Sequence, residues 1–421
     1  MKNILPKSEF AKNVLTLMTG TTIAQAIPVA ISPILTRIYT PEDFGVLTLF
    51  LAITTIFGSI ANGRYELAVM LPEDDEEAIN IFALGVLIVT FLSVTLFGVV
   101  IFFKDYFVSL LDNKEIGFWL YFVPLTVFFI GLFNMLNYYN NRIKKYKDLA
   151  KAKVIKSVIL SVLQVCLGLV KKGALGLITG QIASQLFANI KLISNISDNK
   201  KLLASIHKDK IKRVAKRYER FPKFSMWAVL CNTLSFKLTE ILISTLYSIT
   251  TLGFYSLVGR VLAMPSTLIG GAIGQVFFQE ATKEKHTTGK AEKVFKRTLK
   301  KLLLIGTPFF LILFFIVEEL FAFVFGEEWR IAGYYAKILI PMFYIRFIVG
   351  TLSNIVNVFE QQIFSLLWQF VLLVIFISIL SLSSYLNFSF EKSLIWIAFI
   401  TFLHYLLLLY CVRRISIKGK L

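Results

Sequence analysis

The chain has 421 residues, of which 56% are hydrophobic and 17% charged, and its formal net charge is +19. A soluble protein of this length needs more charge to cover its surface, so the composition predicts an all-α polytopic membrane protein. The three cysteines and three histidines are scattered, which argues against a disulfide framework and against a metal site built on them. The sequence contains no nucleotide-binding loop and no catalytic arrangement of side chains, so neither an enzyme nor a cofactor is expected.

Twelve apolar segments are long enough to cross a bilayer whose hydrocarbon core is about 30 Å thick. In chain order they cover residues 13–36, 44–63, 79–103, 117–138, 154–170, 174–193, 225–246, 252–278, 302–325, 333–355, 363–385 and 394–412. The turn between the first two contains Pro41, which suits the first position of a helix, and acidic residues follow it where a helix N-terminus favours them. The first segment is longer than a signal-peptide core, so we expect it to be retained as a helix.

The loops differ in their content of lysine and arginine. If the N-terminus is cytoplasmic, most of the 45 Lys and Arg residues fall in cytoplasmic loops. The opposite side then carries Arg37, Lys104, Lys114, Lys171, Lys172, Arg330 and Lys392. This asymmetry predicts that both termini are cytoplasmic. The positive net charge is then accounted for by the cytoplasmic loops of a membrane protein, so no nucleic-acid partner is expected.

A basic stretch separates six spans from six. Residues 196–223 carry apolar side chains at helical spacing between lysines and arginines. This pattern predicts an amphipathic cytoplasmic linker helix that lies on anionic membrane lipids, with binding of a cytosolic partner as the alternative. The domain prediction is an N-terminal six-helix lobe over 1–195, the linker over 196–223, and a C-terminal six-helix lobe over 224–421.

The stretch 34–72 has a weak second copy in the other half of the chain. Tyr39 falls on Tyr247 and Gly45 falls on Gly253, and the short turn and the helix lengths are kept. The offset covers an even number of spans, so the two halves have the same orientation. That is a parallel repeat, in which a substrate site is expected between two helical bundles.

Charged residues inside the predicted spans are candidates for function, because they tend to face a bundle interior or a watery cavity. Lys237 and Glu240 lie three residues apart on one helix face, where they form either a structural ion pair or part of a cavity wall. The span of Arg260 contains no acidic residue, so an anionic ligand or an acid from another helix is expected beside Arg260. Arg346 lies in the middle of the tenth span, with the same two alternatives.

Further candidates are polar residues within or at the ends of spans. Arg37 and Arg64 lie near span ends, where they are either interfacial anchors or ligand contacts, and Arg64 is also placed to pair with Glu66. Uncharged groups suited to sugar hydroxyls, or to hydrogen bonds between helices, are Gln25, Asn134, Gln275 and Asn354. The glycines between 270 and 274 predict a close contact between helices.

The N-terminal run LTRIYTPEDFGVLTLF, followed by GRYELAVMLP, resembles the lipid-linked oligosaccharide flippases of the Wzx-type polysaccharide transporter family. That family belongs to the multidrug/oligosaccharidyl-lipid/polysaccharide exporter superfamily. The resemblance is specific over about residues 10–80, and beyond them it depends on length, twelve spans and the six-plus-six repeat.

The resemblance implies two six-helix lobes related by a pseudo-two-fold axis around a V-shaped central cavity. It implies transfer of an undecaprenyl-diphosphate-linked oligosaccharide across the bacterial cytoplasmic (inner) membrane by alternating access. The product would feed O-antigen, capsule or another surface polysaccharide, together with glycosyltransferase and polymerase partners. The diphosphate would bind Arg260, Arg346, Lys237, Arg37 and Arg64, because arginine and lysine neutralise phosphate in a low-dielectric cavity.

Two other functions are weighed against this one. A multidrug exporter of the same superfamily, driven by Na⁺ or H⁺, needs an intramembrane acid to bind a cation, and Glu240 is the best-placed residue for that role. A membrane glycan polymerase or ligase usually carries a large extracytoplasmic loop, and the outer loops here are too short for one. The energy source and the identity of the glycan stay open.

Overall fold

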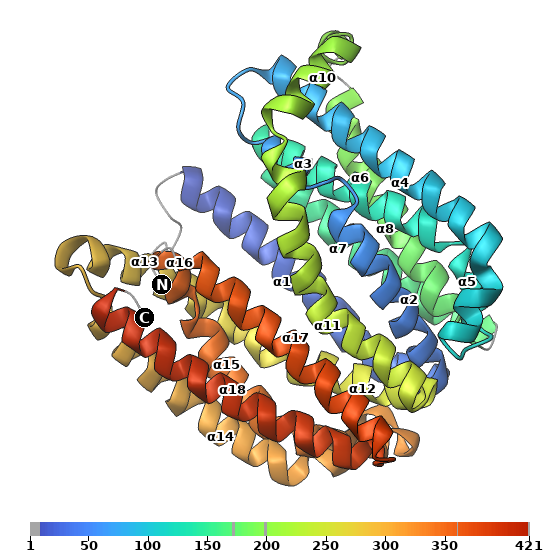
Figure 1. Ribbon diagram of the computed structural model, residues 1–421, viewed down its shortest axis with the longest axis vertical. Helices are drawn as coiled ribbons and strands as arrows, with labels where there is room; N and C mark the ends of the chain where they lie inside the picture. The colour runs from blue at the N-terminus through green and yellow to red at the C-terminus, as the bar shows by residue number, and fades with distance from the viewer. Residues whose placement is uncertain (1–8, 171–172, 198–199, 360, 420–421) are drawn as a thin grey trace, which may run out of the picture. The chain divides into compact units, whose positions relative to one another are not determined.

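The computed structural model describes residues 9–170, 173–197, 200–359 and 361–419, and in these ranges the chain is helical and contains no strand (Figure 1). It divides into two compact units, Met1–Lys237 and Leu238–Leu421. The lobe and linker boundaries expected at 195 and 223 stay a prediction. Some charges used to predict the topology lie outside the described residues: Lys2, Lys7, Lys171, Lys172 and Lys420.

The first unit contains six long helices and the start of a seventh. They are α1 (Glu9–Ile38), α2 (Pro41–Ile60), α4 (Asp75–Leu110), α6 (Val123–Arg142), α7 (Tyr146–Val170), α8 (Leu175–Ser197) and α11 (Met226–Leu246). Short elements connect them: α3 (Tyr65–Ala68), α5 (Ile116–Leu120), α9 (Lys200–Leu203), α10 (Lys208–Arg217) and the π-helical turn η1 (Phe221–Ser225). The boundary between the units falls inside α11.

The second unit is built from five long helices after α11, one of them interrupted. In chain order its elements are α12 (Ile249–Leu262), the π-helical turn η2 (Ser266–Gly270), α13 (Gly271–Thr288), α14 (Glu292–Phe325), the 3₁₀ turn η3 (Glu327–Trp329), α15 (Arg330–Leu352), α16 (Asn354–Val358), α17 (Gln362–Tyr385) and α18 (Phe390–Lys418). The segment Ile249–Thr288 is thus one predicted span made of two helices and a widened turn.

Ten helical segments of the described residues are long and apolar enough to cross a membrane. The two remaining predicted spans, the fourth and the sixth, correspond to α6 and α8, which have 20 and 23 residues but are more polar. Their polarity is satisfied internally, because Asn189 of α8 donates to the Phe129 carbonyl at 2.9 Å and Asn140 of α6 donates to the Leu192 carbonyl at 3.2 Å. The chain is therefore a multi-pass membrane protein, and the count of twelve spans stays a prediction.

The turn expected between the first two spans is confirmed. Thr40 caps α2, with Pro41 as its first residue, and a capping box joins Thr40 to Asp43 through reciprocal hydrogen bonds of 3.3 and 2.9 Å. Tyr39, only 2% exposed, donates its hydroxyl to the Gln164 carbonyl at 2.6 Å. Burial and, to a smaller extent, the Asp43 carboxylate raise the pKa of Tyr39 to about 12, so the phenol stays a donor.

Helices α1 and α7 pack along much of their length in a parallel register. A Cβ added to Gly20 would lie 2.5 Å from the Ala150 Cβ, so the two backbones approach closely at that level. Further along, Ser157 donates to the Ala24 carbonyl at 2.6 Å. The first span therefore depends on the fifth for most of its packing.

Arg142, at the end of α6, organises the loop that joins α3 to α4. Its guanidinium donates to the carbonyls of Val69 and Pro72 and, at 3.1 Å, to that of Glu73. It also pairs with the Asp75 carboxylate at 2.9 Å, while its side chain is 12% exposed. One planar fork of donors thus satisfies several carbonyls that the loop leaves without partners.

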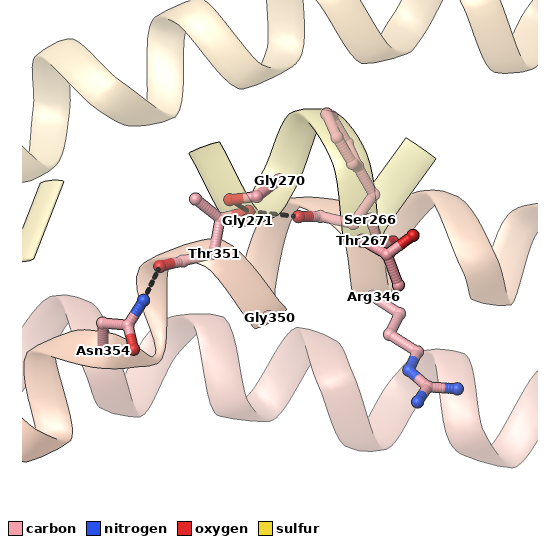
Figure 2. Close-up of a pocket in the computed structure, with 9 residues that line it drawn as sticks. Ser266, Thr267, Gly270, Gly271, Arg346, Gly350, Thr351 and Asn354 are labelled. Carbon is pink, nitrogen blue, oxygen red and sulfur yellow. Dashed lines mark hydrogen bonds between the residues drawn. The ribbon is translucent and has the colours of Figure 1, made fainter. Parts of the chain in front are cut away.

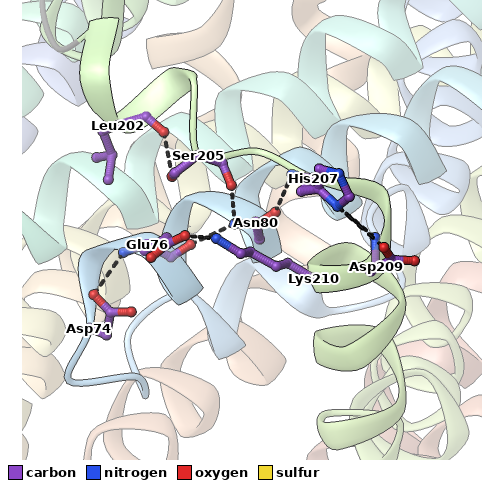
Figure 3. Close-up of polar contacts among 8 residues, drawn as sticks. All are labelled: Asp74, Glu76, Asn80, Leu202, Ser205, His207, Asp209 and Lys210. Carbon is purple, nitrogen blue, oxygen red and sulfur yellow. Dashed lines mark hydrogen bonds and ion pairs between the residues drawn. The ribbon is translucent and has the colours of Figure 1, made fainter.

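The linker is held against the N-terminus of α4 (Figure 3). Asn80, fully buried, donates to the Ser205 carbonyl at 3.3 Å and accepts from the His207 amide at 3.0 Å. An ion pair joins Lys210 of α10 to Glu76. The apolar face of α10 was expected on lipid, but its Val214 belongs to a buried cluster of the first unit. Val214 is thus covered by protein, and a contact of the linker with membrane lipids stays a prediction.

We predict that Arg142→Gln lowers the free energy of unfolding by about 3 kcal/mol, because buried carbonyls and a carboxylate lose a charged donor. Thermal unfolding of the purified protein in detergent measures the change. Arg142→Lys should fall in between, since one ammonium cannot reach all the acceptors. Arg220→Gln, at an exposed arginine, is the control, and equal stability of Arg142→Gln and this control would contradict the role of Arg142.

Candidate functional site

A cavity of about 240 Å³ lies within the second unit, beside η2, α13, α15 and α16 (Figure 2). Polar residues, glycines and one phenylalanine line it: Ser266, Thr267, Gly270, Gly271, Arg346, Phe347, Gly350, Thr351 and Asn354. These residues belong to segments apolar enough to span a membrane. Because hydroxyl, amide and guanidinium groups are costly against lipid, the cavity is suited to water or a polar ligand.

A proline and two glycines shape the helices around the cavity. Pro265 precedes η2 and cannot donate to the preceding turn, which explains why the helix widens there. A Cβ added to Gly270 would lie 2.9 Å from the Thr351 hydroxyl, and one added to Gly274 would lie 3.0 Å from the Asn354 amide. The close helix contact predicted from this glycine cluster is confirmed.

Two other glycines keep the cavity open. A Cβ added to Gly271 or Gly350 would have no heavy atom within 4 Å, and both residues are exposed. Between these walls, Thr351 donates to the Gly270 carbonyl at 3.3 Å, and the Asn354 amide donates to the Thr351 carbonyl at 3.2 Å. The Asn354 side-chain oxygen and the Thr351 hydroxyl oxygen are thus oriented by their own donor bonds.

Arg346 is the charged residue of the cavity lining. It is half-buried, and its guanidinium carbon lies 5.8 Å from the centre of the Phe343 ring. In Figure 2 the guanidinium extends away from Asn354. The structure therefore brings Arg346 and Asn354 into one cavity. Glu240 is half-buried on α11 and is not part of the cavity lining.

The other predicted residues on α11 to α13 do not line this cavity. Arg260 is half-buried in the last turn of α12, Gln275 is exposed on α13, and Lys237 is half-buried on α11. Their assignment as ligand contacts stays a prediction.

The predicted residues of the first unit are spread over several elements. Gln25 and Arg37 are exposed on α1, and Asn134 is half-buried on α6. Arg64 forms an ion pair of 3.0 Å with Glu66, as the local spacing predicted. Arg64 itself has a left-handed backbone with φ of 66°. This conformation is uncommon outside glycine and turns the chain sharply between α2 and α3.

Glu66 is a buried carboxylate, with only 3% of its surface exposed. Burial raises its pKa, and the Arg64 guanidinium partly offsets that shift. The loop therefore holds a carboxyl group whose neutral form is favoured by its surroundings.

Two lysines inside a membrane span were missed by the sequence reasoning. The predicted fifth span begins at residue 154, and Lys153, just before that start, and Lys156, two residues after it, were both assigned to the cytoplasmic loop. The structure begins α7 at Tyr146 and places both lysines, half-buried, inside a segment apolar enough to cross the membrane. Their spacing of three residues, which puts them on one helix face, was the available signal.

The sequence matches, over residues 34–332, a family described as polysaccharide biosynthesis protein. No curated protein matches the chain by sequence. Three similar solved structures are transporters or flippases. An inward-facing multidrug resistance MATE family transporter of the MOP superfamily has 13% identity and a TM-score of 0.70, with 94% of each chain covered.

The lipid II flippase MurJ, in an inward closed conformation, has 12% identity and a TM-score of 0.70, covering 94% of this chain and 87% of its own. A MOP superfamily transporter from Pyrococcus furiosus has 12% identity and a TM-score of 0.60, covering 96% of this chain and 95% of its own. At these identities the likeness establishes the fold, which is that of MOP superfamily transporters.

We predict that Glu66 makes stability depend on pH. Its raised pKa means that the folded protein binds this proton more tightly than the unfolded chain does, so stability falls as pH rises above the ordinary value of 4.5. Glu66→Gln removes this slope, and the melting temperature of the wild type relative to Glu66→Gln should decline as pH rises. Glu328→Gln, at an exposed acid, corrects for the lost charge. A difference that is constant over pH would contradict the assignment.

Proposed function

Because the chain belongs to the family of polysaccharide biosynthesis proteins, we propose that it moves undecaprenyl-diphosphate-linked oligosaccharides across the bacterial cytoplasmic membrane. The repeat units would then be used for O-antigen, capsule or another surface polysaccharide. Transport follows alternating access, with both termini on the cytoplasmic side. Glycosyltransferases supply the substrate and a polymerase consumes it, so this chain carries out transport and no covalent chemistry.

The observation that carries the proposal is the polar cavity with Arg346 at membrane depth. A guanidinium binds phosphate oxygens through two parallel hydrogen bonds, and threonine and asparagine suit sugar hydroxyls. At about 240 Å³ the cavity is smaller than a typical whole-ligand pocket of roughly 300 Å³ or more. It therefore fits one phosphate or sugar group of a larger ligand.

The remaining assignments complete the proposed substrate path. Arg260, Lys237, Arg37 and Arg64 supply positive charge for the diphosphate, and Gln25, Asn134 and Gln275 join Asn354 in binding the glycan. Glu240 is the proposed site for a coupling cation or proton. The lipid tail stays in the bilayer, so it needs no closed pocket.

A Na⁺- or H⁺-coupled multidrug exporter is the second candidate. The position of Glu240 in a segment apolar enough to span a membrane favours it, because an intramembrane acid is the group that binds a coupling cation. Deletion of the gene separates the two: loss of surface glycan supports the flippase, whereas sensitivity to cationic dyes with intact glycan supports the exporter.

We predict that Arg346→Glu and Arg260→Glu each abolish surface glycan in a deletion strain complemented with the variant. A carboxylate would repel the diphosphate where a guanidinium attracts it. Surface glycan is measured by gel and the variant by immunoblot of membranes. Arg220→Glu, at an exposed arginine outside the spans, is the control. Normal glycan in Arg260→Glu or Arg346→Glu cells would remove that residue from the substrate path.

We also predict that filling the cavity blocks transport without a change of charge. Gly350→Leu and Gly271→Leu place a side chain in open space, so they should preserve folding and reduce surface glycan at least tenfold. Gly98→Leu is the matched control, because a Cβ there also meets nothing within 4 Å but Gly98 lies on α4. Wild-type glycan levels in both cavity variants would refute the role of the cavity.

A further inference from the structure

Lys153 and Lys156 lie in the first half of α7, beyond its polar first turns. At its start, Asp148 pairs with Lys191 of α8 at 3.0 Å, which marks a polar level near the end of the span. At 1.5 Å per residue, Lys153 and Lys156 lie about 8 and 12 Å further along the helix. Both therefore lie at the start of the apolar part of the span, three residues apart and on one face.

The ammonium groups stay at this depth. Lys153 donates to the hydroxyl of Thr21 on α1 at 3.1 Å. Lys156 lies over the ring of Phe133 on α6, with its nitrogen 5.3 Å from the ring centre. Phe133 is nine residues before the end of α6, or about 14 Å along the helix. The side chain of Lys156 is therefore not extended to the membrane surface.

Among the described residues, neither ammonium forms an ion pair, and their contacts are the hydroxyl and the ring just given. The sequence explains why, since the six predicted spans of the first unit contain no aspartate or glutamate. Each lysine ammonium offers three hydrogen-bond donors. One hydroxyl and one aromatic ring therefore replace only part of the hydration of the two ammonium groups. Each residue is only partly buried, and the contacts just given leave some of the ammonium donors for a ligand.

The same helix that carries Phe133 also carries two amides. Asn137 lies about one turn after Phe133 on the same face of α6, and Asn134 is the neighbour of Phe133 in sequence. Both are half-buried, and neither side chain makes a hydrogen bond to any residue that the structure describes. Two cations and a helix that offers free amides are suited to an oxyanion attached to a hydroxyl-rich group.

We propose that Lys153 and Lys156 form an anion-binding subsite of the first unit, which takes an oxyanion of the transported ligand. The inference rests on the proposed function and adds a site within the first unit. The oxyanion is either the diphosphate of the lipid carrier or the carboxylate of an acidic sugar, because both offer oxygen acceptors to ammonium donors. Thr21 orients Lys153, and Phe133 holds Lys156 by a cation–π contact.

Binding to the purified full-length protein in neutral-lipid nanodiscs tests the subsite. The probes are undecaprenyl diphosphate, a glucuronate-containing oligosaccharide and phosphatidylglycerol. The variants are Lys153→Gln, Lys156→Gln, the double variant and the double arginine variant, which keeps both charges. Lys151→Gln is the matched control, since Lys151 lies on the same helix and is exposed. Thr21→Val removes the hydroxyl contact without a change of charge, and melting temperatures report folding.

We expect the double glutamine variant to bind undecaprenyl diphosphate at least tenfold more weakly, the arginine variant to restore binding, and Lys151→Gln to match the wild type. Weaker binding of the glucuronate probe instead identifies the carboxylate as the source. Unchanged binding of both probes, or an effect on phosphatidylglycerol alone, overturns the proposal. If Arg346→Gln weakens binding and the lysine variants do not, the subsite fails and the proposed function stands. If the wild type binds neither probe, both fail.

Discussion

A charge inside a bilayer must be balanced by water, an opposite charge or hydrogen-bond partners, and this constraint decides where the polar residues of the chain lie. Lys337 meets it through an ion pair of 2.8 Å with Glu318. Outside the spans, Arg142 is paired in a similar way with carbonyl groups and one carboxylate. Arg346 lines a cavity with hydroxyls and an amide. Within the described part of the chain, Lys153 and Lys156 contact a hydroxyl and a ring and no carboxylate, which is why we propose a ligand there.

Much of the helical framework follows from local sequence. Apolar length predicts most of the spans, and the capping box at Thr40 and Asp43 could be anticipated from Pro41 and the acids after it. Hydropathy predicts a span least well where a helix buries polar groups against neighbouring helices, as α6 and α8 do. The role of Arg142 could not be predicted, because its partners are mostly main-chain carbonyls of a distant loop, and a carbonyl carries no sequence signal.

The candidate site was predictable in part. Arg346 and Asn354 are eight residues apart, about two helical turns, and each is unusual in an apolar span, so both were identified from sequence. Their shared cavity depends on Gly271 and Gly350, because these residues have no side chain to fill the open space beside them. Lys153 and Lys156 were assigned to the preceding basic loop because they lie beside the start of the apolar run, whereas the helix itself begins at Tyr146.

The packing of α1 on α7 has a consequence for how the protein is made. The close approach at Gly20 and Ala150 joins segments separated by roughly 130 residues, which a ribosome adds in about 7 to 26 seconds. During that time the first helix is in the membrane without the neighbour that covers its glycine face. The insertion machinery must therefore stabilise α1 until α7 is made. Substitutions that disrupt α7 should appear first as degradation of nascent chains.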